Sequence, residues 1–143
     1  IGSVRAILKY IPDIVINFGT AGSVNPEYGK GIYKIGSVVQ RDFDARPLVK
    51  KLGEVPFDTT PLSIKLGSGN GPVLSTGDNF VTSKPEVESD LVDMEGYAIA
   101  KVCLELGVDL SMYKYVTDSA DEEAGNDWQS QMRDGAKEFL KLL

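Results

Sequence analysis

The chain has 143 residues, of which 42% are hydrophobic and 25% are charged, as in an ordinary globular protein. This composition excludes disordered, collagen-like and membrane-spanning chains. Fifteen Lys and Arg against 21 Asp and Glu give a net charge of -6, which disfavours nucleic acid and acidic membranes as partners and favours a small molecule or a protein.

Histidine is absent, so histidine-activated nucleophiles and nearly all His-containing metal sites are excluded, and acid–base chemistry is left to carboxylates. The single cysteine, Cys103, cannot form an internal disulfide, and nothing at the N-terminus resembles a signal peptide, so we expect a cytoplasmic protein. The chain opens on Ile1, already within a helical pattern, so we expect residues 1–143 to form a single, partial domain whose first segment is missing.

The first elements are a helix and a strand. Apolar residues recur at helical spacing in residues 1–11, and Pro12 should end that helix. Residues 14–16 form a β-branched run that predicts a strand buried on both faces, and the glycines of residues 19–22 predict a turn directly after it.

The later elements alternate between strands and helices. We expect strands at residues 36–40, 73–76 and 111–117, with loop and edge structure between Pro47 and Pro72. Amphipathic patterns predict helices at residues 93–106 and 127–143. This order predicts an α/β fold, a three-layer α/β/α sandwich with a mixed central sheet.

Two of four candidate site segments contain glycine turns. Small residues in the segment 19–23 would let a ligand approach the backbone amides, although a plain turn at a strand exit is an equal alternative. In the segment 75–81, Phe80 could stack on a planar base, or it could simply fill the core behind an ordinary turn.

The other two segments carry carboxylates. Glu95 follows Asp93 at the start of a predicted helix, where it could bind sugar hydroxyls or merely complement the helix dipole. Asp118 ends a predicted strand, where open α/β sheets tend to bind ligands, so it is either a general acid or a turn-stabilising residue.

Together and in this order, these segments resemble the nucleoside phosphorylase and nucleosidase superfamily, most of all the 5'-methylthioadenosine/S-adenosylhomocysteine nucleosidases. The matching strings are INFGTAG at 16–22, STGDNFV at 75–81, VDMEGYAIA at 92–100 and TDSAD at 117–121. The resemblance covers essentially the whole chain and implies a nucleoside phosphorylase-like sandwich that lacks its first strands.

The resemblance implies cleavage of the N-glycosidic bond of an adenine nucleoside, with no cofactor and no metal. It makes Asp118 the acid at purine N7, Glu95 the partner of the ribose hydroxyls and Met94 the residue that packs on the sugar. Phe80 would stack on the base, and the backbone of Val81 would pair with its edge.

The resemblance also implies further substrate-binding residues. They are Thr20, Ala21, Gly22, Asp93, Thr117 and Ala120. Asp93 stands where these enzymes often have Glu, and Lys114 stands where the better-known nucleosidases have Arg. Asp44 and Arg46 face either a substrate tail or a subunit interface, or they pair with each other.

Related phosphorylases often carry a phosphate-binding Arg where this chain has Asn17, which favours a hydrolase. The alternatives are a purine nucleoside phosphorylase, an AMP nucleosidase, or a truncated, non-catalytic nucleoside-binding module. The water-activating glutamate of the family would lie in the missing N-terminal segment. The resemblance is also compatible with a homodimer.

Overall fold

The computed structural model describes residues 1–81, 83–119 and 128–142. Three helices and seven strands are described in this part of the chain. In chain order they are α1 (Gly2–Tyr10), β1 (Ile14–Ser23), β2 (Gly31–Lys34), β3 (Ser37–Gln40), β4 (Ser63–Lys65), β5 (Val73–Thr76), β6 (Leu91–Asp93), α2 (Gly96–Leu106), β7 (Asp109–Ser119) and α3 (Trp128–Leu140).

The strands form one mixed sheet in the order β2-β7-β1-β6-β5-β3-β4. Long parallel strands β1 and β7 pair from Ile14↔Asp109 onwards, and β5 pairs in parallel with both β3 and β6. The pairs β1 with β6, β2 with β7 and β3 with β4 are antiparallel. The expected α/β fold with a mixed sheet is therefore confirmed.

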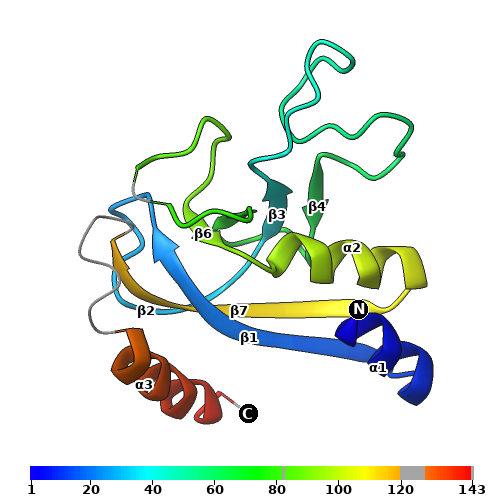
Figure 1. Ribbon diagram of the computed structural model, residues 1–143. Helices are drawn as coiled ribbons and strands as arrows, with labels where there is room; N and C mark the ends of the chain where they lie inside the picture. The colour runs from blue at the N-terminus through cyan, green and yellow to red at the C-terminus, as the bar shows by residue number, and fades with distance from the viewer. Residues whose placement is uncertain (82, 120–127, 143) are drawn as a thin grey trace.

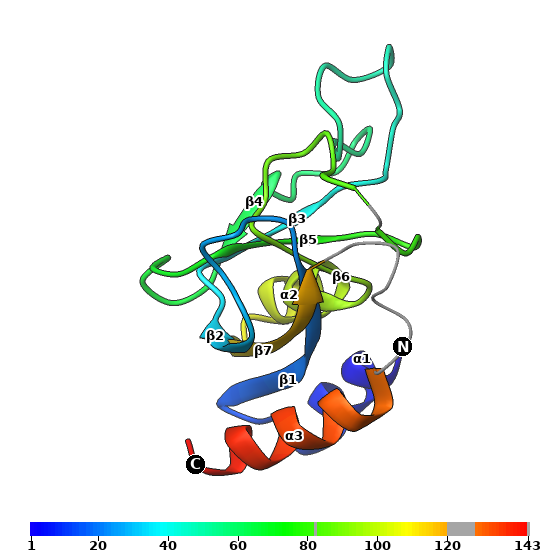
Figure 2. The ribbon, with the colours of Figure 1, turned by 90° about the vertical axis from the view of Figure 1, so that its left-hand side faces the viewer.

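Helices cover the two faces of the sheet. Helix α2 contacts β3, β4, β5 and β7, whereas α3 contacts β1, β2 and β7. Figures 1 and 2 show α2 and α3 on opposite sides of the β1–β7 pair, with α1 near the start of β1. This is the three-layer arrangement expected for the chain.

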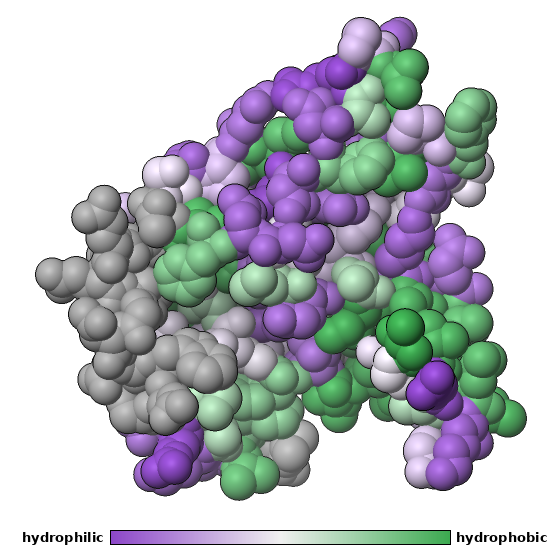
Figure 3. Space-filling model, in the orientation of Figure 1, coloured by the Kyte–Doolittle hydropathy of each residue, from purple (hydrophilic) through white to green (hydrophobic). Residues whose placement is uncertain are grey.

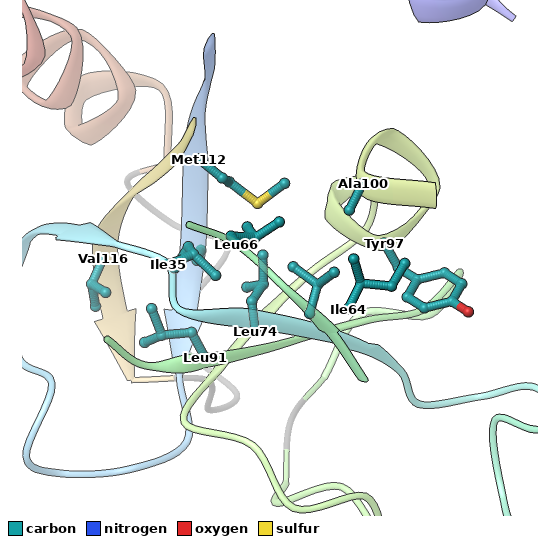
Figure 4. Close-up of a cluster of buried hydrophobic side chains, with 11 residues drawn as sticks. Ile35, Ile64, Leu66, Leu74, Leu91, Tyr97, Ala100, Met112 and Val116 are labelled. Atoms are coloured by element: carbon teal, nitrogen blue, oxygen red, sulfur yellow. The ribbon is translucent and has the colours of Figure 1, made fainter. Parts of the chain in front are cut away.

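The main core lies between the sheet and α2. Figure 4 shows side chains from the strands meeting Tyr97 and Ala100 of the helix. The cluster comprises Ala21, Ile35, Val38, Ile64, Leu66, Leu74, Leu91, Tyr97, Ala100, Met112 and Val116. Cys103, expected to be a small core residue, is also buried on α2.

Strand β1 differs from expectation in two ways. It continues through Gly19 to Ser23 instead of ending in a turn, because its backbone stays paired with β7 along this length. Ile14 and Ile16 are about half exposed, so this strand is not buried on both faces. They share a face with Phe18, whose ring stacks on Phe139 of α3.

Other boundaries also differ from expectation. Asp93 ends strand β6 and does not lie in the helix, which begins at Gly96 after Glu95 as its N-cap. The buried face of α2 includes Tyr97, whereas the next residue, Ala98, is exposed. The sequence patterns missed β2 and β6, which have only four and three residues.

The first helix ends where the sequence predicts. Ile11, just before Pro12, adopts φ 46° and its N–H bonds the carbonyl of Ile7, which closes the last turn. Apolar side chains gather over α1 on the molecular surface in Figure 3, where Leu8 and Ile11 are exposed. Within the described ranges, no helix is both long enough and apolar enough to cross a membrane.

Candidate active site

A cavity of about 690 Å³ opens beside the ends of several strands. It receives side chains from β1, β6, β7, α3 and the loop after β5. The lining residues are Phe18, Gly19, Thr20, Ala21, Gly22, Arg41, Asn79, Phe80, Val81, Val92, Asp93, Met94, Glu95, Thr117, Met132 and Ala136. The four segments singled out in the sequence therefore meet at one place.

The segment Thr20 to Gly22 lines the cavity from within β1. Just before this segment, the β1 backbone lies close to a side chain of β7, because a Cβ at Gly19 would lie 3.0 Å from Lys114 Nζ. Glycine inside a strand commonly marks such a close approach. Gly19 thus makes room for the Lys114 ammonium group, a role that the predicted glycine turn did not anticipate.

Asp93 lies at the centre of a buried polar network. Its Oδ1 accepts a hydrogen bond of 2.6 Å from Thr76, and its Oδ2 accepts one of 2.9 Å from the Gly96 N–H. Oδ2 also lies 2.8 Å from Lys114 Nζ. Thr76 Oγ1 accepts a bond from the Tyr97 N–H, so the network joins β5, β6, β7 and the start of α2.

Met94 and Glu95 follow directly and line the cavity. Both are exposed, whereas Asp93 before them and Gly96 after them are buried. The two side chains therefore project from a backbone that is fixed on either side. Glu95 can accept hydrogen bonds from a ligand, and Met94 offers an apolar surface.

Phe80 and Val81 line another wall of the cavity, in the loop after β5. Phe80 is 63% exposed, so it does not fill the core as the alternative interpretation required. An exposed ring beside a cavity is available to stack on a planar group.

Strand β7 brings Thr117 and Asp118 to the same end of the sheet. Thr117 is buried and lines the cavity. The pairing with β1 shifts there: Ala21 pairs with Val116, but Gly22 pairs with Asp118. Such a bulge changes the direction of side chains and is common beside active sites. The Asp118 side chain lies outside the described part of the structure, as does Ala120.

Sequence reasoning missed several lining residues. Met132 and Ala136 come from α3, for which the sequence predicts only an amphipathic helix. Arg41 also lines the cavity and lies outside all four motifs, whereas Asn79 lies within the segment 75–81 but was not singled out there. Among the residues that the structure describes, no group of three or more His, Cys, Asp or Glu is arranged to hold a metal ion.

Asp44 and Arg46 are paired outside the cavity. Arg46 lies 2.6 Å from Asp44 and 2.8 Å from Glu86, so it connects two loops. Its hydrogen bonds lower the pKa of Asp44 to about 2. Of the interpretations left open for these residues, the structure supports structural pairing.

Comparison with known proteins gives one family match, which is described as the Phosphorylase superfamily and covers residues 2–143. A 5'-methylthioadenosine/S-adenosylhomocysteine nucleosidase of an Exiguobacterium strain is 32% identical, with 87% of this chain and 64% of the relative covered. The aminodeoxyfutalosine nucleosidase of Helicobacter pylori is 33% identical, with 95% of this chain and 49% of the relative covered.

Solved structures share the fold. One of them is a mutant of the Helicobacter pylori 5'-methylthioadenosine/S-adenosylhomocysteine nucleosidase, crystallised with 5'-methylthioadenosine in its active site. It superimposes on this chain with a TM-score of 0.83. Sequence identity is 22%, and the match covers 99% of this chain and 74% of that one. The chain therefore spans between about half and three quarters of the length of these similar proteins.

Proposed function

The chain belongs to the phosphorylase superfamily, and on that premise we propose that it hydrolyses the N-glycosidic bond of an adenine nucleoside. The observation that carries the proposal is the convergence of four sequence segments on one cavity of about 690 Å³. A cavity of this size, with apolar walls and a few polar groups, is typical of a small-molecule site.

The cavity offers suitable surfaces for the two halves of a nucleoside. Phe80 would stack on the adenine ring, and the backbone of Val81 would pair with its edge. Glu95 would accept hydrogen bonds from the ribose hydroxyls while Met94 packs on the sugar. Thr20, Ala21 and Gly22 would line the side from which water approaches.

Asp118 is our candidate for the general acid. Its backbone pairs with Gly22 at the β-bulge, directly after the cavity residue Thr117. In the proposed reaction, water attacks the anomeric carbon and gives one proton to the water-activating glutamate, while the electron pair of the breaking C–N bond leaves with adenine. Protonation of N7 by Asp118 would make adenine a better leaving group. We include Ala120 in this part of the site as a prediction.

The arrangement of cations favours hydrolysis over phosphorolysis. Among the described lining residues, Arg41 is the one cation, and both of its Nη atoms bond backbone oxygens. Lys114 is paired with Asp93, and Asn17 carries no charge. A phosphate ion would find few free donors in this part of the cavity.

The names of the relatives suggest which nucleosides to test. They are nucleosidases for 5'-methylthioadenosine and S-adenosylhomocysteine, and for aminodeoxyfutalosine. We propose the first two compounds as substrates because four motifs of this chain resemble their nucleosidases. By the same resemblance, we propose a role in methionine salvage.

Adenine release in phosphate-free buffer tests the proposal. We expect adenine release from 5'-methylthioadenosine when the chain is joined to a preceding segment that carries the water-activating glutamate, and in that protein Asp118→Asn should slow release by about 10²- to 10⁴-fold. Asp109→Asn, at the other end of the same strand, is the matched control and should leave the rate unchanged.

Other outcomes would assign a different function. Phosphate-dependent release that yields ribose 1-phosphate would identify a phosphorylase, and ribose 5-phosphate from AMP would identify an AMP nucleosidase. Nucleoside binding by calorimetry without adenine release, even with the preceding segment and its glutamate present, would identify a binding module. Each of these results would overturn the proposed hydrolysis.

We further propose that the protein works as a homodimer in the cytoplasm. A free, buried Cys103 is suited to a reducing compartment. Exposed apolar residues on and directly after α1, including Leu8 and the C-cap residue Ile11, offer a surface for association. Light scattering on the purified protein should give twice the chain mass, and a monomer at micromolar concentration would contradict this proposal.

A further inference from the structure

Arg41 is a buried cation at the centre of the loops that surround the cavity. It follows directly after β3 and is 6% exposed. Its Nη1 donates hydrogen bonds of 2.8 Å to the Ser75 carbonyl and 2.7 Å to the Asp93 carbonyl. Its Nη2 donates bonds of 3.3 Å to the Gly77 carbonyl and 2.6 Å to the Asn79 carbonyl.

Two of these carbonyls immediately precede the residues that would contact substrate. Asn79 comes just before Phe80, and Asp93 comes just before Met94 and Glu95. One planar guanidinium therefore bonds the backbone on the base side and the backbone on the sugar side of the proposed site. Because guanidinium geometry is rigid, these bonds hold the two backbones at a defined separation.

The surroundings of Arg41 keep its head group in place. A Cβ at Gly77 would lie 2.8 Å from Asp42 and 2.9 Å from Arg41 Cζ, so space is closed on that side. Asp42 Oδ2 accepts a hydrogen bond of 2.5 Å from the Asp78 N–H and so fastens the same turn. Burial lowers the pKa of Arg41, and Asp42, Asp93 and Asp78 oppose that shift.

Arg41 is poorly placed to bind an anionic ligand. Each Nη carries two hydrogens, and the four bonds to backbone carbonyls use all of them. The remaining Nε has no partner among the described residues, but it is buried. The donors of Arg41 are thus directed at the protein backbone.

We propose that Arg41 is a positioning residue that sets the spacing between the base-stacking Phe80 and the sugar-binding Glu95. The inference rests on the proposed function, since it assigns the two halves of one nucleoside to these two side chains. Its specific consequence is that Arg41 matters most for ligands that occupy both halves at once. Free adenine, which occupies only one half, should be much less sensitive.

Calorimetric binding of adenine and of 5'-methylthioadenosine tests this consequence. For Arg41→Lys, which keeps the charge but cannot bridge four carbonyls, we expect nucleoside affinity to fall at least about tenfold. Adenine affinity should change by no more than about twofold, which is about 0.4 kcal/mol against the 1.4 kcal/mol that a tenfold change represents. To avoid hydrolysis, both titrations use the Asp118→Asn background.

Arg46→Lys is the matched control. This arginine lies on the same loop but bonds the carboxylates of Asp44 and Glu86, outside the cavity lining. Both affinities should stay as in the parent protein. Val38→Ala removes buried side-chain atoms from β3, the strand directly before Arg41, and so controls for a general loss of stability. It should leave the ratio of the two affinities unchanged.

Gly77→Ala is a second route to the same test if the Arg41 variant does not fold. The added methyl group crowds Arg41 Cζ without removing the guanidinium, so the same selective loss is expected. Equal losses for adenine and the nucleoside, or no loss for either, would overturn the positioning role. If the parent protein binds neither ligand, the proposed function itself fails, and the two failures remain distinguishable.

Discussion

Lys114 and Asp93 form an ion pair beneath the cavity, with 2.8 Å between Nζ and Oδ2, and it is almost completely withdrawn from water. The two side chains are 2% and 1% exposed. The pair joins β7 to β6 on either side of β1, and the same carboxylate bonds Thr76 and the first residue of α2. The sequence comparison drew attention to both positions, but only the fold pairs them.

Removing one partner of this ion pair should lower the stability of the protein. In Lys114→Met the Asp93 carboxylate would stay buried without its counter-ion, which typically lowers the free energy of unfolding by about 3–5 kcal/mol. Adding Asp93→Asn removes that charge, so the double variant should regain at least about 1 kcal/mol. Urea denaturation of the parent, the two single variants and the double variant measures the difference. Additive losses in the double variant would contradict a coupled pair.

Gly135 should not tolerate a methyl group, although it lies inside α3. A Cβ there would lie 2.6 Å from Tyr115 Cγ, in contact with a buried ring. Overpacking of this kind typically costs about 1–3 kcal/mol, which should exceed the gain of about 1 kcal/mol in helix propensity. Gly135→Ala should therefore lower the melting temperature.

A matched substitution separates packing from propensity. Gly2→Ala in α1 adds a methyl group where nothing lies within 4 Å, so it should be neutral or stabilising. Gly135→Ala should also slow adenine release, because α3 contributes Met132 and Ala136 to the cavity. A more stable Gly135→Ala protein would show that the helix shifts without cost.

Asp58 and Lys101 should make stability depend on pH in acid. The hydrogen bond from Lys101, followed by those from Thr60, holds the pKa of Asp58 well below its usual range. A lowered native pKa adds stability at neutral pH, and that contribution disappears as pH falls through the native pKa. Asp58→Asn should thus be less stable than the parent at pH 7, and the difference should shrink below about pH 4.

Lys101, the partner of Asp58, contributes to stability over the opposite pH range. Its pKa is raised, chiefly by the bond to Asp58, so its contribution is present below the ordinary lysine pKa and is lost as pH rises through the native value. Thermal melts of Asp58→Asn and Lys101→Met between pH 3 and pH 11 measure the loss of stability in both pH ranges. A stability difference for Asp58→Asn that does not change with acidification would contradict the assignment.

Glu95 should contribute to nucleoside binding but not to adenine binding. A hydrogen bond to a charged group is worth about 1.5–3 kcal/mol, so Glu95→Gln should weaken 5'-methylthioadenosine by about tenfold to a hundredfold. Free adenine lacks the ribose hydroxyls and should bind as before. Glu105→Gln, an exposed change near the other end of α2, is the control. Unchanged nucleoside affinity would remove Glu95 from the site.

Much of the fold could be predicted from the local sequence. The helix before Pro12 and the strand at Val73–Thr76 form where hydrophobic spacing, and residues that end helices or strands, predict them. Such patterns are reliable because they depend on neighbours within one or two turns. Short β2 and β6 were missed, since strands of three or four residues carry too little periodicity and depend on pairing with distant segments.

The site was predicted only in part. Motifs identified Phe80 and Glu95, and the structure brings both to one cavity together with Thr20 and Thr117. Arg41 was missed, because its importance comes from carbonyls 34 to 52 residues away in the sequence. Met132 was missed as well, since helical spacing does not say whether an apolar face meets the core or a ligand.

The sequence by itself determined the chemical types available: carboxylates without histidine, an aromatic ring and small residues in a recognisable order. Those features follow from composition and local spacing. The tertiary structure alone decided that Lys114 neutralises Asp93 and that Arg41 joins the two sides of the cavity. Electrostatic and hydrogen-bond partners depend on distance in space, and folding brings together residues that the chain order keeps far apart.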